Sequence, residues 1–390
     1  MLSSLKRAVY PLSSALFANA SLVEGTLKGG GRTKFRCLFV HHCSFNEHLR
    51  ERSFEADMTV QRTWRIFIPS LLGLVRQSRV EFDACVAVLP SFYSFLFDSV
   101  CDFKGREEIR QVVDTSGSWE GVRQGLSKTK RQITNNFPEK FGLSSRMSKD
   151  IDEFDNFYHR MYLPHIQKRY GDLSQIDSYE SMRKFFEKGV LLLITKGDRP
   201  VAGALSLIEG KSLVFRRTGV LDGDESHVKG GAQLALYYFQ LKYAVDNNFD
   251  TFDTMKSAPF LNDGVFRHKS EWGARTVPDY EAEKAVYLFA RGSAEKLAEF
   301  FNTNPIVIGA GAELSGVVGD PRANEGAPNS SDELLRRFHT IGLRELRVYT
   351  PAGLKTVAVT ATAGALAKAA PAPRKPQVDN LRSARSQLSS

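Results

Sequence analysis

Three apolar runs separated by short glycine-containing turns do most to limit what this chain can fold into. The runs are Val190 to Thr195, Val201 to Ile208 and Ser212 to Val220, and the turns contain Gly197-Asp198 and Glu209-Gly210. Apolar runs of this length with turns between them predict an antiparallel meander of three strands. A glycine pair, Gly230-Gly231, then opens a long apolar helix, so the sequence predicts a sheet that feeds directly into a helix.

The elements around this meander predict a protein of the α/β class. From Leu143 onward we expect, in order, the strand Leu143 to Met147, a helix capped by Ser148 or Asp150 that runs to about Tyr170, a helix from Ser178 to Glu187, the meander, the Gly-Gly helix, the strand Phe249 to Asp253, a short helix from Asp263 to Trp272 and the strand Ala285 to Ala290. Residues 33 to 40 and 82 to 89 also have the apolar, β-branched composition of strands.

Composition and charge are those of a globular protein with two domains. The chain has 390 residues, 42% apolar and 25% charged, and a net charge of +9. Residues 331 to 390 carry +6 of that charge, so the preceding part is nearly neutral, which argues against a nucleic-acid partner. The basic C-terminal tail can contact anionic surfaces.

Cysteine spacing and apolar stretches predict where the protein works. The four cysteines form no Cys-x-x-Cys pair, so we expect neither a metal site nor a disulfide framework, and we expect a reducing, cytoplasmic location. The longest apolar stretches, Ile66 to Val75 and Ala84 to Phe97, are too short or too interrupted for a membrane span of about 20 residues.

The segment that joins the meander to the next helix resembles a phosphate-binding loop. The sequence His227-Val228-Lys229-Gly230-Gly231-Ala232 resembles the Q/R-x-x-G-x-G/A pyrophosphate loop of the GNAT superfamily of acyl-CoA N-acyltransferases, with His227 in the position of Gln or Arg. Glycines let backbone N–H groups approach phosphate oxygens, and the helix N-terminus adds partial positive charge. A plain turn before a helix is the alternative interpretation of Gly-Gly.

The stretch from Phe249 to Ala274 narrows the resemblance. Phe252-Asp253, Ser257-x-Pro259, Asp263-Gly264 and Phe266-x-x-Lys269-x-x-Trp272-Gly273 together resemble the FemAB-like, peptidoglycan-bridge-forming branch of GNAT proteins. Phe and Lys are adjacent in most of that branch, whereas Arg267 and His268 separate them here. The basic segment 127–131 also resembles a FemAB-like element.

The resemblance implies a GNAT fold, with a mixed, mostly antiparallel sheet flanked by helices, and a pairing of two tandem GNAT-like halves, the first of them degenerate. The divisions expected are an N-terminal extension over 1–30, a degenerate first GNAT-like half over 31–118, a basic helical connector over 119–142, the acyltransferase domain over 143–300, and a low-complexity, largely disordered tail over 301–390, in which Asp332 to Phe338 can form a short helix.

The resemblance also implies a donor site and a general base. Backbone groups of Thr218, Gly219 and Val220 would hold the acyl arm of the donor, and His227, Lys229, Gly230, Gly231 and Ala232 would hold its phosphates. Asp253 is the first candidate for the general base, with His268 and Lys269 as further catalytic candidates. A cap on the following turn is the alternative role for Asp253.

Acceptor-binding candidates come from two elements before the loop and one after it. Tyr158, Tyr162 and His165 fall at i, i+4 and i+7 on one helix face, which indicates either a core stripe or a substrate-contacting wall. Arg216 and Arg217 are neighbours on one strand, so at most one faces the cleft. The candidates for acceptor contacts are Tyr158, His165, Arg217 and Ser257.

The function predicted is an acyl-CoA-dependent N-acyltransferase, with acetyl-CoA or another acyl-CoA as cosubstrate and no metal. The acceptor would be an amine of a sugar, a glycan precursor or an amino-acid-derived molecule, as in polysaccharide or cell-envelope biosynthesis. One alternative is a FemAB-like transferase that uses aminoacyl-tRNA, the only interpretation with a nucleic-acid partner; another is a non-catalytic GNAT-like binding module.

Overall fold

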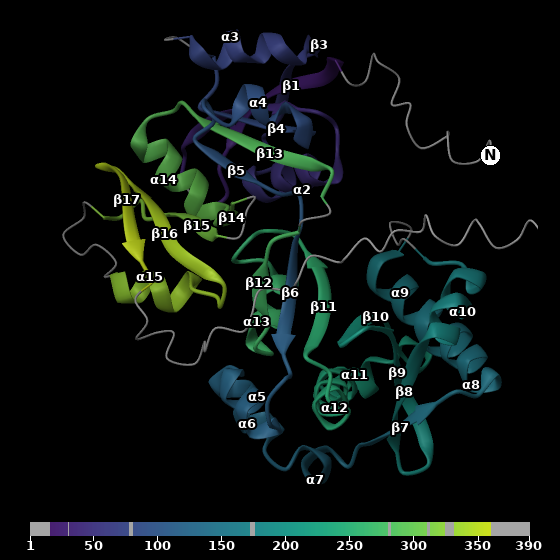
Figure 1. Ribbon diagram of the computed structural model, residues 1–390. Coiled ribbons are helices and arrows are strands. Elements are labelled where there is room, and N and C mark those ends of the chain that lie inside the picture. Colours follow the sequence, from purple (N-terminus) through teal and green to yellow (C-terminus); the bar gives the residue numbers. More distant parts are fainter. Residues whose placement is uncertain are drawn as a thin grey trace, which may run out of the picture.

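The structure, a computed structural model, is built from three sheets flanked by helices (Figure 1). It describes residues 16–29, 31–77, 81–171, 176–279, 282–309, 313–323 and 331–359. This architecture confirms the predicted mixed α/β class. No helix within these ranges is long and apolar enough to cross a membrane.

The first sheet belongs mainly to the N-terminal part of the chain. Its strand order is β3-β1-β2-β4-β13-β5, and β2 and β4 are parallel to each other. Its strands are β1 (Phe17–Thr26), β2 (Lys34–Val40), β3 (Thr59–Phe67), β4 (Ala84–Pro90), β5 (Phe103–Gly105) and β13 (Lys284–Ala290). The helices of this part are α2 (Ser44–Ser53), α3 (Leu71–Arg76) and α4 (Ser94–Phe97).

The second sheet contains the predicted meander. Its strand order is β12-β6-β11-β10-β9-β8-β7, and β8, β9 and β10 pair in antiparallel fashion as expected. Its strands are β6 (Ile109–Asp114), β7 (Ser144–Ser148), β8 (Gly189–Lys196), β9 (Arg199–Glu209), β10 (Ser212–Val220), β11 (Thr251–Ser257) and β12 (Arg275–Val277).

Helices cover both faces of the second sheet. One face packs against α12 (Ala232–Asp246), the helix that follows Gly231. The other face packs against a π-helix, η4 (Phe157–Tyr162), and α10 (Tyr179–Lys188). The predicted helix up to Tyr170 is therefore three consecutive segments: α8 (Ile151–Asn156), η4 and α9 (Leu163–Tyr170). Asp150 caps the first of them, because its Oδ1 accepts from the backbone N–H groups of Asp152 and Glu153.

The two sheets exchange one strand each. Strand β6 follows the strands of the first half but pairs with β11, and β13 comes from the second half but pairs with β4. Figure 1 shows this directly: blue β6 lies beside green β11 and β12, and green β13 crosses the blue strands of the first sheet. A cut at residue 118 would therefore not yield two separable sheets, because each half completes the other.

The connector between the halves consists of three short helices. They are α5 (Trp119–Gly125), α6 (Lys128–Thr134) and α7 (Phe137–Phe141). Pro138 lies in the first turn of α7, where a backbone N–H would have no intrahelical acceptor in any case.

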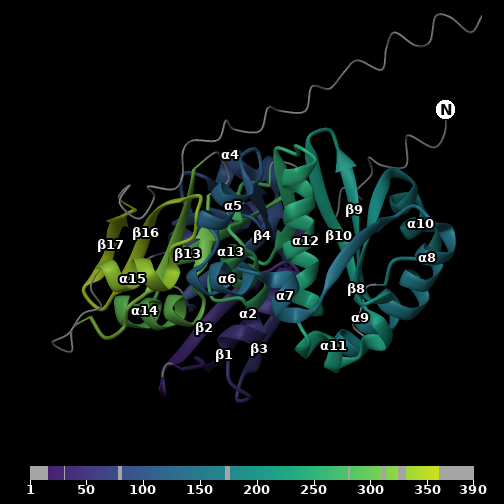
Figure 2. The same cartoon turned by 90° about the horizontal axis from the view of Figure 1, so that it is seen from below.

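The prediction of a disordered tail from residue 301 is wrong for the described residues 301–309, 313–323 and 331–359. A third sheet, ordered β14-β15-β16-β17, follows α14 (Ala294–Thr303) and appears in yellow-green in Figures 1 and 2. Its elements are β14 (Ile306–Ile308), β15 (Leu314–Gly319), the predicted short helix α15 (Ser331–Phe338), β16 (Leu343–Thr350) and β17 (Gly353–Ala358). Phe300 stacks on Phe35 and Phe301 on Tyr349, so α14 joins this sheet to the first one. Residues 360–390 lie outside the described part.

The N-terminal extension predicted for residues 1–30 is also wrong from Phe17 onward. Strand β1 occupies the interior of the first sheet between β2 and β3, with Ala18, Ala20 and Leu22 in the core.

Candidate functional site

Strands β10 and β11 part from each other at the centre of the second sheet. They pair in parallel over three residues only, from Ser212 with Thr251 to Val214 with Asp253. Beyond this point β10 continues to Val220 and pairs with β9 on one side, while its edge toward β11 has no strand partner among the described residues. A strand edge without a partner presents backbone N–H and C=O groups that can bind an extended ligand.

The first sheet has no such opening at the corresponding place. Its parallel pair, β2 and β4, stays paired from Cys37 with Ala84 to Val40 with Ala87, where β2 ends. The wedge between parallel strands is thus a property of the second half.

Strand β11 contains a bulge and then pairs with β6 again at Lys256 and Ser257. Its register with β6 shifts between Asp253 and Lys256, and Met255 has a φ of 66°. A positive φ is rare for a residue with a side chain, and such conformations persist where the surroundings fix them. Two of the three catalytic candidates, Asp253 and Lys269, supply that fixation.

Asp253 is almost fully buried at the start of the bulge. Its Oδ1 accepts from the Met255 N–H at 2.7 Å, and its Oδ2 lies 3.3 Å from Nε of Arg110. Burial raises the pKa of this carboxyl, and the Arg110 charge and the Met255 hydrogen bond oppose that rise. The structural role considered for Asp253, capping the turn that follows it, is thus present in the structure; its role as a base stays a prediction.

Lys269 reaches the same bulge from α13 (Gly264–Glu271). Its Nζ donates to the carbonyl oxygens of Met255 at 3.2 Å and Lys256 at 2.9 Å, and the residue is 5% exposed. Burial lowers the pKa of this ammonium group to about 8, although the nearby Asp253 opposes the shift. Asp263 caps the helix as expected, since its Oδ1 accepts from the N–H groups of Val265 and Phe266.

The side-chain amide of Gln111, which is buried behind the bulge, was not predicted to belong to the site from the sequence. Ser257 donates to Gln111 Oε1 at 2.8 Å, and Gln111 Nε2 donates to the Phe266 carbonyl and to Ser270 Oγ. Ser257 was expected to contact the acceptor, but this network places it behind the cleft, where it ties β11 to β6 and α13. Gln111 and Arg110 come from β6, which is far from Asp253 in the sequence. No sequence pattern around Asp253 therefore indicates that these two residues lie beside it.

His268 lies apart from the bulge. Its ring meets Tyr237 edge-on at 4.8 Å and lies 6.5 Å from the Trp272 ring, so it packs between α13 and α12. The structure therefore brings Asp253 and Lys269 to one bulge, whereas the ring of His268 packs against the aromatic rings of Tyr237 and Trp272.

The predicted phosphate loop contains a helical turn. His227 and Lys229 belong to α11 (Glu225–Lys229), and Lys229 is exposed, 3.9 Å from Glu225. Gly231 has a φ of 93° and caps α12 without a side-chain acceptor for the first N–H groups of that helix. A Cβ at this position would lie 2.5 Å from the Phe141 ring, so the glycine also permits the close packing of α7.

A cavity of about 210 Å³ opens beside the start of α12. It is lined by His165 and Lys168 from α9, Gln233 from the first turn of α12, and Gly223, Glu225 and Val228. His165 was predicted to contact the acceptor, whereas the structure places it beside the candidate phosphate site. Lys168 was not singled out, because one lysine on a helix gives no sequence signal.

Tyr158 and Arg217 converge on Asp177. Tyr158 Oη donates to the Asp177 carbonyl at 3.0 Å, the Asp177 N–H donates to Tyr162 Oη at 3.0 Å, and Arg217 Nε forms an ion pair with the Asp177 carboxylate. Tyr158 and Tyr162 thus lie on one helix face as predicted. Their hydroxyl groups form hydrogen bonds with the backbone of Asp177, which precedes α10. Asp177 was missed because it lies outside any periodic element.

Arg216 occupies the mouth of the wedge. It is the extra residue of a bulge in β10, its Nη1 lies 3.6 Å from Met255 Sδ, and its guanidinium covers the Phe185 ring at 4.7 Å. No carboxylate in the described residues pairs with this half-buried cation, and its Nε is buried without an acceptor there. Of the two neighbouring arginines, Arg217 forms an ion pair with Asp177, whereas Arg216 has no carboxylate partner among the described residues.

Gly219 allows the π-helix to lie directly on β10. A Cβ there would lie 2.4 Å from the Met161 carbonyl carbon and 2.5 Å from the Tyr162 nitrogen, both backbone atoms that cannot rotate away. We expect Gly219→Ala to lower the free energy of unfolding by about 1–3 kcal/mol, measured by urea denaturation. Gly264→Ala is the control, because a Cβ at Gly264 meets nothing within 4 Å; equal stability of the two variants would contradict the prediction.

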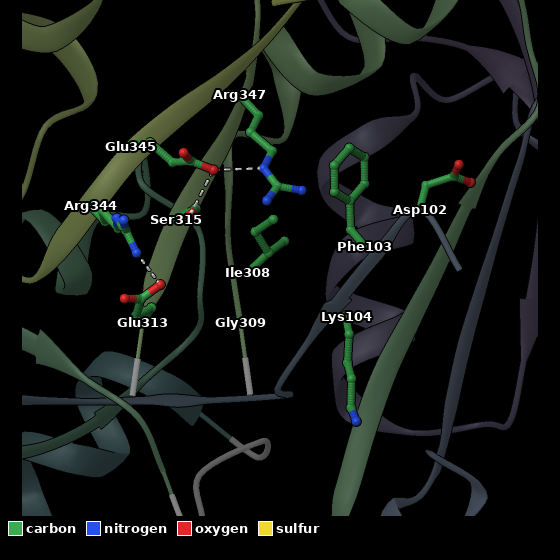
Figure 3. A pocket seen from close by; sticks show the side chains of 10 residues that line it. All are labelled: Asp102, Phe103, Lys104, Ile308, Gly309, Glu313, Ser315, Arg344, Glu345 and Arg347. Atoms are coloured by element: carbon green, nitrogen blue, oxygen red, sulfur yellow. Dashed lines mark hydrogen bonds and ion pairs between the residues drawn. The ribbon is translucent and has the colours of Figure 1, made fainter. Parts of the chain in front are cut away.

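A second cavity, of about 390 Å³, lies where β5 meets the third sheet (Figure 3). Arg344 pairs there with Glu313 and Arg347 with Glu345, so these charges are compensated. None of the predicted site residues lines it. The wedge and the start of α12 are therefore the better candidate site.

Comparison with known proteins gives structural similarity without sequence similarity. No protein-family model matches the chain, and no curated protein matches it. Similar solved structures include FemX (11% identity, 72% of this chain and 87% of that chain, TM-score 0.36) and the C-terminal domain of a putative lysylphosphatidylglycerol synthetase from Agrobacterium fabrum (12%, 72% and 83%, 0.33). Another is a GCN5-related N-acetyltransferase from Kribbella flavida (16%, 53% and 68%, 0.25). With TM-scores this low, the fold description rests on the strand order and the wedge.

Proposed function

We propose that the protein is an acyl-CoA-dependent N-acyltransferase that acts in the wedge between β10 and β11. The observation that carries the proposal is the parting of these strands after Val214 and Asp253, which leaves the β10 edge free. An acyl donor with an amide-containing arm can pair with that edge at Thr218 to Val220. The first N–H groups of α12, with Lys168 nearby, suit the phosphates of the same donor.

Amine acylation needs a neutral amine, a held carbonyl and donors for the oxyanion. In the proposed reaction Asp253 accepts the proton of the attacking amine, because its raised pKa brings it closer to a useful base. The new C–N bond replaces the C–S bond of the donor thioester, and coenzyme A leaves as the thiol after taking up the proton released by the amine. Lys269 holds the bulge in place and adds positive charge beside the developing oxyanion. Backbone N–H groups on the free β10 edge are the remaining oxyanion donors.

The uncompensated Arg216 favours an acceptor that carries a carboxylate or a phosphate. A cation held over an aromatic ring and lacking a carboxylate partner gains most from an anionic ligand. Sugar phosphates and amino-acid-derived amines both meet this description, within the acceptor class predicted from the sequence.

Calorimetric titration of the purified chain with acetyl-CoA and longer acyl-CoA species tests the donor. We expect binding that Lys168→Ala weakens by about five- to tenfold through the loss of one phosphate contact. Turnover is then measured against a panel of anionic amines. Failure of every acyl-CoA to bind would overturn the proposal, and acceptance of an aminoacyl-tRNA donor instead would replace it with the second transferase class.

A further inference from the structure

The outer edge of β3 carries features that the proposed acyl transfer does not use. β3 is the edge strand of the first sheet, and among the described strands it pairs with β1 alone. Seven of its nine residues are exposed, and only Ile66 is buried. An edge strand of this length with free backbone groups is a template for the addition of another strand.

Two arginines on this strand are positioned by aromatic rings. The Arg62 guanidinium lies 4.8 Å from the Trp64 ring centre, and that of Arg65 lies 5.4 Å from the ring centre of Phe17. Neither arginine pairs with a carboxylate in the described part of the chain. From Met58 to Val80 the sequence contains no Asp or Glu.

A groove of about 440 Å³ runs beside this edge. It is lined by residues of β3 and α3 and has no acidic member: Arg62, Trp64, Arg65, Ile66, Phe67, Ser70, Gly73, Leu74 and Gln77. The groove combines positive charge with apolar surface from Phe67 and Leu74, which suits an extended chain that carries acidic side chains on both of its faces, with apolar or small side chains between them.

We propose that the β3 edge binds an acidic peptide segment in extended conformation, which adds a strand to the first sheet. The backbone of the segment pairs with β3, and its carboxylates pair with Arg62 on one face and Arg65 on the other. A second copy of this chain fits less well, because two β3 strands would bring arginines together without an acid. The ends of this chain fit less well for the same reason, since residues 1–15 and 360–390 are basic.

Single-stranded RNA would use fewer of these features. A phosphodiester backbone has no N–H groups to complement a strand edge, and the ring faces of Trp64 and Phe17 already carry guanidinium groups. Charge complementarity together with the free edge therefore favours a peptide.

Fluorescence anisotropy of the full chain with a labelled twelve-residue peptide that repeats Glu-Glu-Thr-Thr, and so carries Glu on both faces when extended, tests the proposal. We expect the Arg62→Ala/Arg65→Ala double variant to bind at least tenfold more weakly, and Arg199→Ala, which removes an exposed arginine of β9, to bind as the wild type does. A peptide N-methylated at every residue keeps its carboxylates but has no backbone N–H to donate to β3, and we expect it to bind at least tenfold more weakly.

Three results would overturn the proposal. They are absence of peptide binding, equal binding of the N-methylated peptide, and tighter binding of oligouridylate or of vesicles containing phosphatidylglycerol than of the peptide. Both arginines are exposed on a surface strand, so the double variant is expected to keep the wild-type thermal unfolding midpoint.

Discussion

Lys269→Met is expected to lower kcat by about 100-fold or more while the protein stays folded. Methionine has a similar length but donates nothing, so the Met255 and Lys256 carbonyl oxygens would lose their common partner. The bulge with its positive φ at Met255 would then relax and move Asp253 relative to the wedge. Steady-state turnover of the acyl-CoA and acceptor pair measures the effect.

The same variant makes a prediction about stability and pH. The folded pKa of Lys269, about 8, lies below its ordinary value of 10.5, so between these two pH values the unfolded chain binds more protons than the folded one. Stability contributed by this group therefore rises with pH across that interval. Relative to Lys269→Met, the wild type should gain about 3 kcal/mol between pH 8 and pH 10.5.

A second buried lysine provides the matched control. Lys130 is 7% exposed, lies 3.5 Å from Glu271 and covers the Trp272 ring, so it contacts α13 without touching the bulge. Lys130→Met should alter stability but leave kcat within a few-fold of the wild type. Equal losses of kcat in the two variants would mean that Lys269 acts only by holding α13.

The parts of the fold that could be predicted are those specified by local pattern. The meander, the helix after Gly231 and the Asp263 cap each follow from residues close together in the sequence. Turn chemistry and helix capping are decided within a few residues, so a single sequence contains the necessary information.

The exchange of β6 and β13 could not be predicted, because strand pairing across a chain depends on packing between distant segments. Nothing in residues 109–114 says that they will pair with β11 rather than with the preceding strands. Strand β3 was missed for a different reason: it has an exposed edge and no alternation of apolar and polar residues. The third sheet was not predicted because the sequence after residue 301 is rich in small residues, a composition that we interpreted as disordered.

The site was predicted in part for the same physical reasons. Asp253 and Lys269 lie in a recognisable motif, and the structure brings them to one bulge. Their supporting residues, Arg110 and Gln111, come from the exchanged strand and could not be identified without the topology. Ser257 and His268 have side chains that could take part in catalysis. In the structure the Ser257 hydroxyl donates to Gln111 and the His268 ring packs against Tyr237.

Asp253→Asn is expected to lower kcat by about 10²- to 10⁴-fold, the range typical of a lost general base. The asparagine Oδ1 can still accept from the Met255 N–H, so the bulge keeps its cap and the variant should remain folded. Because burial raises the pKa of Asp253, wild-type kcat should fall on acidification at a higher pH than an ordinary aspartate would give. The variant should lack that acid limb in a pH–rate profile.

Asp263→Asn separates loss of the base from loss of a carboxylate in general. Asp263 caps α13 through the same kind of oxygen-to-N–H contact, and asparagine is an equally good cap, so kcat should stay near that of the wild type. Unchanged turnover in Asp253→Asn would restrict Asp253 to its structural contact with Met255. Lys269→Met is expected to disturb the bulge, whereas Asp253→Asn preserves it. A large loss of kcat in Lys269→Met but not in Asp253→Asn would therefore mean that catalysis depends on the geometry of the wedge and not on a carboxylate base.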